Sequence, residues 1–227
     1  FSRWFGHDAV IERCLKRISE KEAQLIFLLD LVGSLARTAL EQRDAKESKR
    51  SVWQQINLEK NIYSLLAYSG DSRVRMHAFK CLTTAIPALT GDVRNFSLEQ
   101  DIYSFIYRAA LDDSEDTWIQ VEALSLLKYL SVDSLETVLQ KRLQQSANRE
   151  DIFVRKHCIL LMGDIYELAP DLSGYFQDAA RDPSPFVRQG LAQATATALL
   201  QAYDQGLLET LQSLLLRDES VHVRAKA

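Results

Sequence analysis

The stretch "DPSPFVR" at residues 182–188 contains the signals with which an α-helix commonly begins. Ser184 is a residue type whose side-chain oxygen can accept a hydrogen bond from a free amide of the first helical turn. Pro185 follows, where the fixed φ of proline suits the first helical residue and its missing N–H leaves no bond unmade. The stretch therefore predicts a helix that begins at Pro185 and carries Val187 and Arg188 in its first turn.

The pattern around Val187 recurs at four other places in the chain. The five aligned residues are Val74, Ile119, Val154, Val187 and Val223, and their spacings are 45, 35, 33 and 36 positions. Three residues before each stands an Asp or a Ser that can cap a helix, namely Asp71, Asp116, Asp151, Ser184 and Ser220. A helix start that returns at this period predicts repeated helical units.

Apolar residues follow each aligned position at the spacing of one helix face. In the first unit they are Ala78, Cys81, Leu82 and Ala85, and in the third they are Cys158, Leu161, Met162 and Ile165. Second amphipathic segments lie between these helices: "LEQDIYSFIYRAAL" from 98, "SLETVLQKRL" from 134, "LSGYFQDAA" from 172 and "GLLETLQSLLL" from 206. Each unit is thus predicted to be helix, turn, helix, and stacked units of this kind form an all-α solenoid of antiparallel helix pairs.

Two of the turns carry a more specific pattern. In "DPSPFVR" at 182–188 and "DESVHVR" at 218–224 an Asp stands six residues before an Arg. This resembles the HEAT-repeat family, and the resemblance implies a right-handed superhelix. It also implies a structural ladder along the turns formed by Asp182, Arg188, Asp218 and Arg224. Earlier units depart from the pattern, because Ser69, Ser114 and Arg149 replace the Asp and Gln120 replaces the Arg.

The resemblance covers residues 55–227, with the last repeat truncated. In residues 1–54, "DAVIERCLKRIS" from 8 and "EAQLIFLLDLVGSLARTAL" from 22 predict a helix pair, followed by the polar connection "EQRDAKESKRS" from 41. This part is expected to be a degenerate or capping repeat. The chain begins with Phe1 and stops within the helix opening "VHVRAKA". We therefore expect one continuous solenoid that belongs to a longer protein.

Composition and charge restrict the function. The 227 residues include only 8 Gly and 4 Pro, which favours helices. The formal net charge is −4, and the residues after 70 carry 16 Lys and Arg against 22 Asp and Glu, so a nucleic-acid partner is disfavoured. The most apolar run, "QLIFLLDLVGSLA" from 24, is short for a bilayer and contains Asp30, so no membrane span is predicted.

Cysteine usage indicates the compartment. Cys14, Cys81 and Cys158 are odd in number, far apart and placed within apolar patterns. This arrangement is typical of reduced core thiols rather than of a disulfide framework. We therefore expect a cytoplasmic protein, or a cytoplasmic-facing domain of a larger one.

The candidate binding surface is the face of the second helices that points away from the core. In solenoids this face usually lines the concave groove. Its residues are Met76, His77, Lys80 and Thr84; Glu122, Ser125, Lys128 and Tyr129; Lys156, His157, Leu160 and Asp164; and Gln189 and Gln193. Mixed charge together with Met, Tyr and Leu suits a protein or peptide partner, or another domain of the same longer chain.

Chemical sites are not predicted on this surface. His77, Glu122 and His157 share one register, but neighbouring helices stand about 8–10 Å apart and zinc ligands must lie about 2 Å from one ion. The acidic segment "LDDSED" from 111 falls between helices, where carboxylates favour the start of the next helix. No phosphate loop, zinc-spaced His pair or nucleophile motif stands out. We predict no catalytic residue, no cofactor and no obligate metal.

The favoured function is a non-enzymatic scaffold for protein binding. The alternative follows from the resemblance, because some HEAT-like proteins are enzymes, among them alkylpurine DNA glycosylases and phycobilin lyases. Work on DNA calls for a basic groove with aromatic residues, and Trp118, next to a helix start, is the one feature that fits it. We expect Trp118 to be packed between units instead. The bilin and the acceptor thiol of a lyase have no counterpart in these residues.

Overall fold

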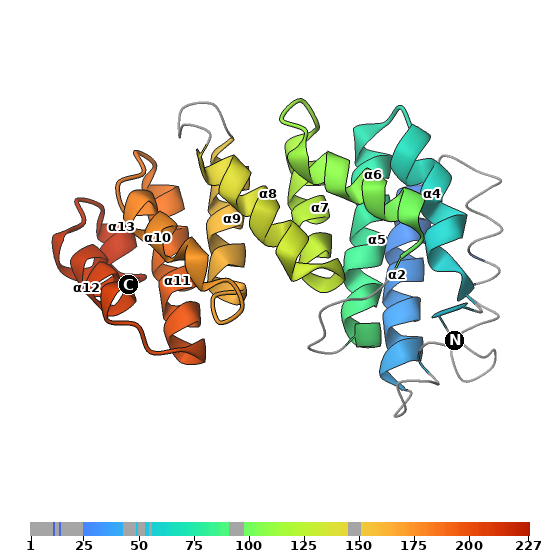
Figure 1. Ribbon diagram of the computed structural model, residues 1–227. Coiled ribbons are helices and arrows are strands. Elements are labelled where there is room, and N and C mark those ends of the chain that lie inside the picture. Colours follow the sequence, from blue (N-terminus) through green and yellow to red (C-terminus); the bar gives the residue numbers. More distant parts are fainter. Residues whose placement is uncertain are drawn as a thin grey trace. The chain divides into compact units, whose positions relative to one another are not determined.

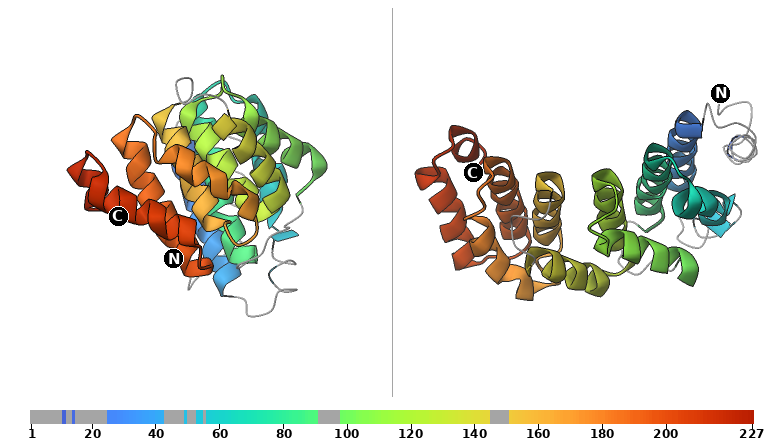
Figure 2. Two further views of the ribbon diagram at one scale, coloured as in Figure 1. Left: turned by 60° about the vertical axis from the view of Figure 1, so that its left-hand side comes forward. Right: turned by 90° about the horizontal axis from the view of Figure 1, so that it is seen from above.

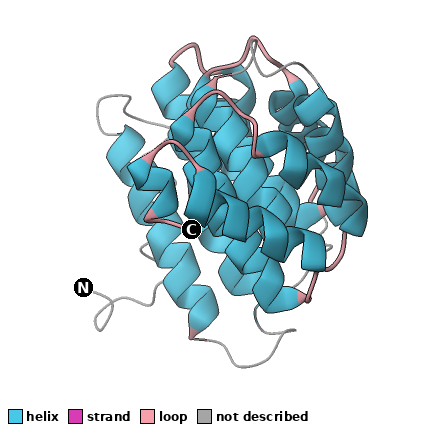
Figure 3. Cartoon of the chain, turned by 90° about the vertical axis from the view of Figure 1, so that its left-hand side faces the viewer, coloured by secondary structure: helices cyan, strands magenta, loops and turns pink. Residues whose placement is uncertain are grey.

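The computed structural model describes residues 11, 14, 25–42, 49, 53–54, 56–90, 98–144 and 151–227. Within them the chain consists of helices and connecting loops, without a strand (Figure 3). This confirms the prediction of an all-α protein. The chain divides into two compact units, Phe1–Ala109 and Ala110–Ala227. No described helix combines the length and the apolar character needed to cross a bilayer.

The first unit is built around one long helix pair. Helix α2 (Leu25–Glu41) packs along α5 (Ser72–Thr90), and α4 (Leu58–Tyr68) packs on α5 as well (Figure 1). A Cβ on Gly33 would lie only 3.0 Å from the Cα of Cys81, so the glycine permits the close approach of α2 to α5. Helix α6 (Gln100–Leu111) begins in this unit and ends with the first residues of the second.

The predicted N-terminal helix pair is described only in part. Its second helix is α2. Of the first predicted segment only Ile11 and Cys14 are described, and both are helical and buried. In the predicted polar connection, Glu41 ends α2 and Lys49 is helical, while positions 43–48 and 50–51 lie outside the described residues.

The second unit contains two layers of helices. One layer holds α7 (Thr117–Leu130), α9 (Ile152–Asp164) and α11 (Pro185–Gln201), and the other holds α8 (Val132–Gln144), α10 (Ser173–Ala179) and α12 (Gln205–Arg217) (Figure 2). The 3₁₀ turn η2 (Pro170–Leu172) precedes α10, and the short helix α13 (Val221–Arg224) packs on α11 and α12. Neighbouring helices of the first layer pack directly, α7 on α9 and α9 on α11.

The predicted helix starts are confirmed. Helices α5, α7, α9, α11 and α13 begin immediately after Asp71, Asp116, Asp151, Ser184 and Ser220. The predicted apolar faces are confirmed too, since Ala78, Cys81, Leu82, Ala85, Cys158, Leu161, Met162 and Ile165 are all buried. Cys14, Cys81 and Cys158 are buried, and burial raises the pKa of Cys81 to about 12.

The cap prediction holds for the aspartates and is wrong for the serines. The carboxylate of Asp116 accepts a hydrogen bond from the amide of Trp118 at 2.9 Å, and that of Asp151 from the amide of Phe153 at 2.7 Å. The hydroxyls of Ser184 and Ser220 accept no bond from the helix that follows. Instead, the amide of Ser184 donates to the carboxylate of Asp182, and the amide of Ser220 to that of Asp218. Each of these carboxylates also accepts hydrogen bonds from an arginine.

Helices α9 and α11 approach each other unusually closely. A Cβ on Gly163 would lie 2.5 Å from the main-chain oxygen of Ala194, a distance that real side chains do not adopt. A Cβ on Gly190 would lie 2.7 Å from Cγ of Lys156. One glycine on each helix therefore sets the separation of these two helices and seats the stem of Lys156 between them.

Candidate functional site

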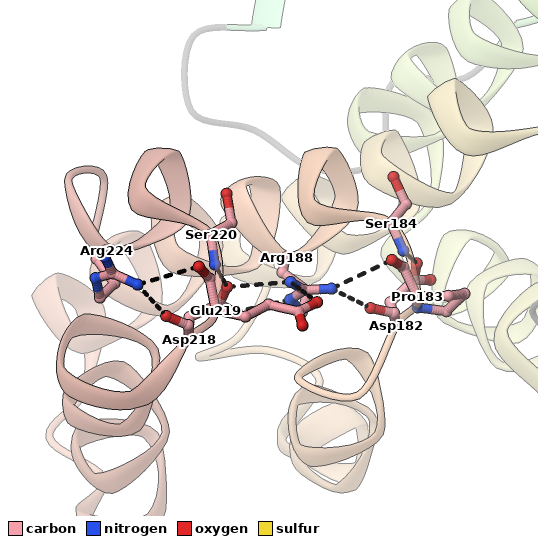
Figure 4. Close-up of polar contacts among 8 residues, drawn as sticks. All are labelled: Asp182, Pro183, Ser184, Arg188, Asp218, Glu219, Ser220 and Arg224. Carbon is pink, nitrogen blue, oxygen red and sulfur yellow. Dashed lines mark hydrogen bonds and ion pairs between the residues drawn. The ribbon is translucent and has the colours of Figure 1, made fainter.

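The turns of the second unit are braced by arginine side chains. Arg188 donates from Nε and Nη2 to the two carboxylate oxygens of Asp218, at 2.7 and 3.0 Å, and from Nη1 to the main-chain oxygen of Asp182 at 2.7 Å (Figure 4). The two paired side chains are 7% and 4% exposed. A bidentate pair with this burial is a strong structural contact, and it ties the turn before α11 to the turn before α13.

The same contact occurs one turn earlier, where the sequence pattern did not place it. Arg155 donates to both carboxylate oxygens of Asp182, at 3.0 and 3.2 Å. The amide of Ser184 also donates to the Asp182 carboxylate, at 2.8 Å. The carboxylate of each Asp thus pairs with the Arg of the preceding helix in the same layer, whereas the Arg six residues after it binds the main-chain oxygen of that Asp. The signal in the sequence was the Arg that follows Val154, in register with Arg188.

Two other side chains in the arginine register, Gln120 and Arg224, bond main-chain oxygens of their own turns. Gln120, in the arginine register, donates from Nε2 to the main-chain oxygen of Glu115 at 2.7 Å. Arg224 donates from Nη1 to the main-chain oxygens of Asp218 and Glu219. Both side chains therefore hold their own turn. Gln120 is too short to bridge to another turn, and its Oε1 is buried without a partner among the described residues.

Arg142 on α8 is a second buried arginine, and it has no counterpart in the repeat pattern. Its side chain donates from Nε and Nη2 to the main-chain oxygen of Ala110, at 2.8 and 2.6 Å, and from Nη1 to Asp113 at 3.0 Å. The arginine is 2% exposed. The carbonyls in the last turn of a helix have no N–H partner within the helix. Arg142 supplies such a partner to the last turn of α6, so the role of Arg142 is structural.

The candidate binding residues share one property in the structure: none of them is buried. Lys80 and Gln193 are exposed. Partly exposed are Met76, His77, Thr84, Glu122, Ser125, Lys128, Tyr129, Lys156, His157, Leu160, Asp164 and Gln189. The apolar residues between them on the same helices are buried. The predicted division of each second helix into a core face and an accessible face is therefore present.

In the second unit these side chains connect α7 to α9. The hydroxyl of Ser125 lies 2.8 Å from Nε2 of His157, and Nζ of Lys128 donates to a carboxylate oxygen of Asp164 at 2.6 Å. Burial lowers the pKa of His157 to about 4, so its ring is neutral at neutral pH. Nζ of Lys128 also lies 5.7 Å from the ring centroid of Tyr129. The accessible face is held rigid by contacts between helices.

In the first unit an acidic residue that the sequence pattern missed joins the candidate set. Oδ1 of Asp30, on α2, lies 2.8 Å from Nδ1 of His77 and 3.8 Å from Nζ of Lys80. Thr84 donates its hydroxyl to the main-chain oxygen of Lys80 at 2.7 Å. In the sequence Asp30 indicates only that its apolar run does not span a membrane, because nothing there shows that α2 lies beside α5.

His77 and His157, which share one register in the repeat, have different partners. His77 pairs with Asp30 and His157 with Ser125. Among the residues that the structure describes, no group of three or more His, Cys, Asp and Glu side chains is arranged to hold a metal ion.

The prediction that Trp118 is packed between units is wrong for much of its surface. Trp118 is 52% exposed, and its ring lies against that of Phe153 with 5.4 Å between centroids. Phe153 in turn meets Phe186 at 5.4 Å, edge to face. The reason is position: Trp118 stands four residues before Glu122, and Phe153 four before His157, so the rings lie on the accessible face. This spacing was the signal that could have identified them.

Comparison with known proteins adds no assignment: no family model, curated protein or solved structure matches the chain. The functional argument therefore rests on the chain's own contacts. Those contacts separate the residues into two groups. Arg155, Asp182, Arg188 and Asp218 are buried or nearly so and brace the turns, whereas the side chains of the accessible face can still meet a partner.

Proposed function

We propose that the chain is a right-handed α-solenoid of HEAT-like helix pairs that binds a protein or peptide partner and catalyses no reaction. The binding surface is the accessible face of the second helices. The partner is a separate protein or another domain of a longer chain. The odd number of cysteines and their burial in the apolar core support a cytoplasmic location, because proteins of oxidising compartments commonly pair their cysteines in disulfides.

The observation that carries this proposal is the pair of contacts between α7 and α9, Ser125 with His157 and Lys128 with Asp164. They hold neighbouring helices in one arrangement before any partner arrives. A preorganised surface loses less conformational entropy on binding than a mobile one. The same face presents aromatic, aliphatic, amide and charged groups, a mixture found in protein interfaces.

The inter-turn arginine pairs support the solenoid half of the proposal. Arg155 with Asp182 and Arg188 with Asp218 repeat the same bond between successive helix pairs. A contact that repeats from unit to unit is what a stacked array of equivalent units requires.

Site-specific photo-crosslinking in cell extract tests the proposal. A benzophenone side chain is placed at Tyr129 or Gln193, on the accessible face, and at the exposed residues Lys141 and Gln177, on α8 and α10, as matched controls. We expect adducts with another protein from the first two positions only. Equal adducts from all four positions would contradict the proposal.

The nucleic-acid alternative is tested with the same protein. A labelled DNA duplex is titrated at two salt concentrations. Binding that weakens steeply with salt would indicate phosphate contacts and would favour the glycosylase-like reading over a protein scaffold.

A further inference from the structure

Three aromatic rings form a continuous row in the second unit. Trp118, Phe153 and Phe186 are the second residues of α7, α9 and α11, and successive ring centroids lie 5.4 Å apart. Each ring stands one residue before an aligned core position. The row therefore begins the accessible face at the N-terminal end of each helix and continues across three neighbouring helices.

The row is open to solvent over much of its area. Trp118 is 52% exposed, Phe153 is 41% exposed, and the adjacent Ile152 is 39% exposed. Hydrated apolar surface is unfavourable. Single exposed apolar residues are common, whereas contiguous ones mark interaction sites. Trp is among the residues that contribute most to binding energy at protein interfaces.

Two lysines lie at the α11 end of the row. Nζ of Lys156 stands 3.6 Å from the ring centroid of Phe186, and its stem occupies the space left by Gly190. Lys226 is close enough to lower the pKa of Lys156, after the larger effect of burial. Within the described part of the chain neither ammonium has a carboxylate within 4.0 Å, although acids outnumber bases after residue 70.

The arrangement thus combines an exposed apolar end and a positive end. We name Trp118, Ile152, Phe153, Phe186, Lys156 and Lys226 the aromatic strip. A carboxylate placed between the two lysines would remove their mutual repulsion and replace water on a partly desolvated ammonium. An apolar side chain on Trp118 and Phe153 would cover the exposed rings.

We propose that the aromatic strip binds an extended peptide in which apolar residues are followed by acidic ones. The apolar part lies on Trp118 and Phe153, and the acidic part lies at Lys156 and Lys226. From α7 to α13 there are three helix spacings of about 9 Å, which an extended chain covers with about eight residues. The inference rests on the proposed function and adds the class of partner.

The test uses the intact chain and three synthetic peptide libraries. All have a randomised apolar and aromatic half followed by a fixed half of glutamate, serine or lysine. We expect the chain to retain the glutamate library over the other two. Peptides recovered from it are then measured by fluorescence anisotropy. Replacing Trp118 and Phe153 together by Ala should weaken binding about tenfold or more.

Charge variants test the acidic half. The double variant Lys156→Glu and Lys226→Glu should exchange the preference from glutamate to lysine peptides. Lys226 is exposed, so Lys226→Glu alone should leave the fold intact. This single variant should also weaken the binding of glutamate peptides. The matched control is Leu200→Ala with Tyr203→Ala, which are 89% and 76% exposed outside the strip and should leave binding unchanged. Circular dichroism and melting temperature confirm that the variants fold.

Several results would overturn the inference. One is no preference for glutamate peptides, and another is binding that the strip variants leave unchanged. Retention of single-stranded oligothymidine that is lost in the Trp118 and Phe153 variant would make the strip a base-stacking surface. A dimer in light scattering that the same variant dissociates would make it a self-association surface. If crosslinking from Tyr129 and Gln193 still captures a protein in any of these cases, only the strip is excluded and the proposed function stands.

Discussion

Arg155 and Asp182 are joined by two hydrogen bonds although 27 residues separate them, and both side chains are nearly buried. The arginine belongs to α9 and the aspartate to the turn before α11. Arg188 and Asp218 repeat this relationship one helix further on. The turn aspartates therefore have two tasks: each carboxylate accepts a hydrogen bond from the amide of the serine that precedes the next helix, and each pairs with an arginine of the preceding helix in the same layer.

Asp182→Ala should destabilise the protein by about 3–5 kcal/mol, because it removes the carboxylate that accepts two hydrogen bonds from the nearly buried guanidinium of Arg155. The measurement is the free energy of unfolding from urea denaturation. Asp178→Ala, an exposed aspartate on α10, serves as the control and should change stability by less than about 0.5 kcal/mol. Similar losses in both variants would show that the pair contributes nothing specific.

His157 should make stability depend on pH between its two pKa values. Burial lowers its pKa from the ordinary 6.5 to about 4, so between these values the unfolded chain binds more protons than the folded one. Its contribution is therefore complete above pH 6.5 and falls as the pH drops toward 4, by up to about 3 kcal/mol. Urea denaturation of the wild type and of His157→Gln from pH 7.5 to 4.5 measures this. Parallel curves for the two proteins would contradict the prediction, as would a His157 pKa near 6.5 by NMR.

Gly163→Ala should separate α9 from α11, because its Cβ would meet the backbone of Ala194 and backbone cannot rotate away. We expect a loss of about 1–3 kcal/mol, the usual range for overpacking. Gly174→Ala, on α10, has open space around the new Cβ and should instead stabilise by about 0.5–1 kcal/mol. Thermal and urea denaturation compare the two. An equal gain in both variants would show that the helices can move apart freely.

Arg142→Ala should destabilise by about 2–4 kcal/mol, since it removes the Nε and Nη2 donors that bind the carbonyl of Ala110 in a buried place and leaves a cavity. Lys141→Ala, one residue earlier and exposed, is the matched control and should be nearly neutral. Hydrogen exchange at the end of α6 should increase in the arginine variant only. Unchanged hydrogen exchange at the end of α6 would show that Arg142 does not cap this helix.

Much of the local structure could be predicted from the sequence because helix starts depend on short-range chemistry. Asp116 and Asp151 cap the helices that follow them through amides two residues away. Core positions such as Leu82 and Met162 follow from a 3.6-residue period, which any helix with one buried face must obey.

For the candidate surface, the sequence predicts which side of each helix is accessible, but not which side chains of neighbouring helices meet. The register placed Ser125, Lys128, His157 and Asp164 on one side of their helices, and they lie there. Which of them meet depends on the shift of α9 along α7, and this shift comes from packing between helices. Asp30 was missed for the same reason, because its partner His77 lies 47 residues away.

The starts of the second helices, their buried faces and their accessible residues follow from the sequence, because these properties depend on contacts within a helical turn. The pairing of the Asp182 carboxylate with Arg155, and the row formed by Trp118, Phe153 and Phe186, follow from the packing of helices against one another. Both results need the distance between helices; between α9 and α11, Gly163 permits the close approach of the Ala194 backbone and Gly190 leaves room for the side chain of Lys156. The distance between two helices depends on both packed surfaces, so it cannot be read from the sequence of either helix alone.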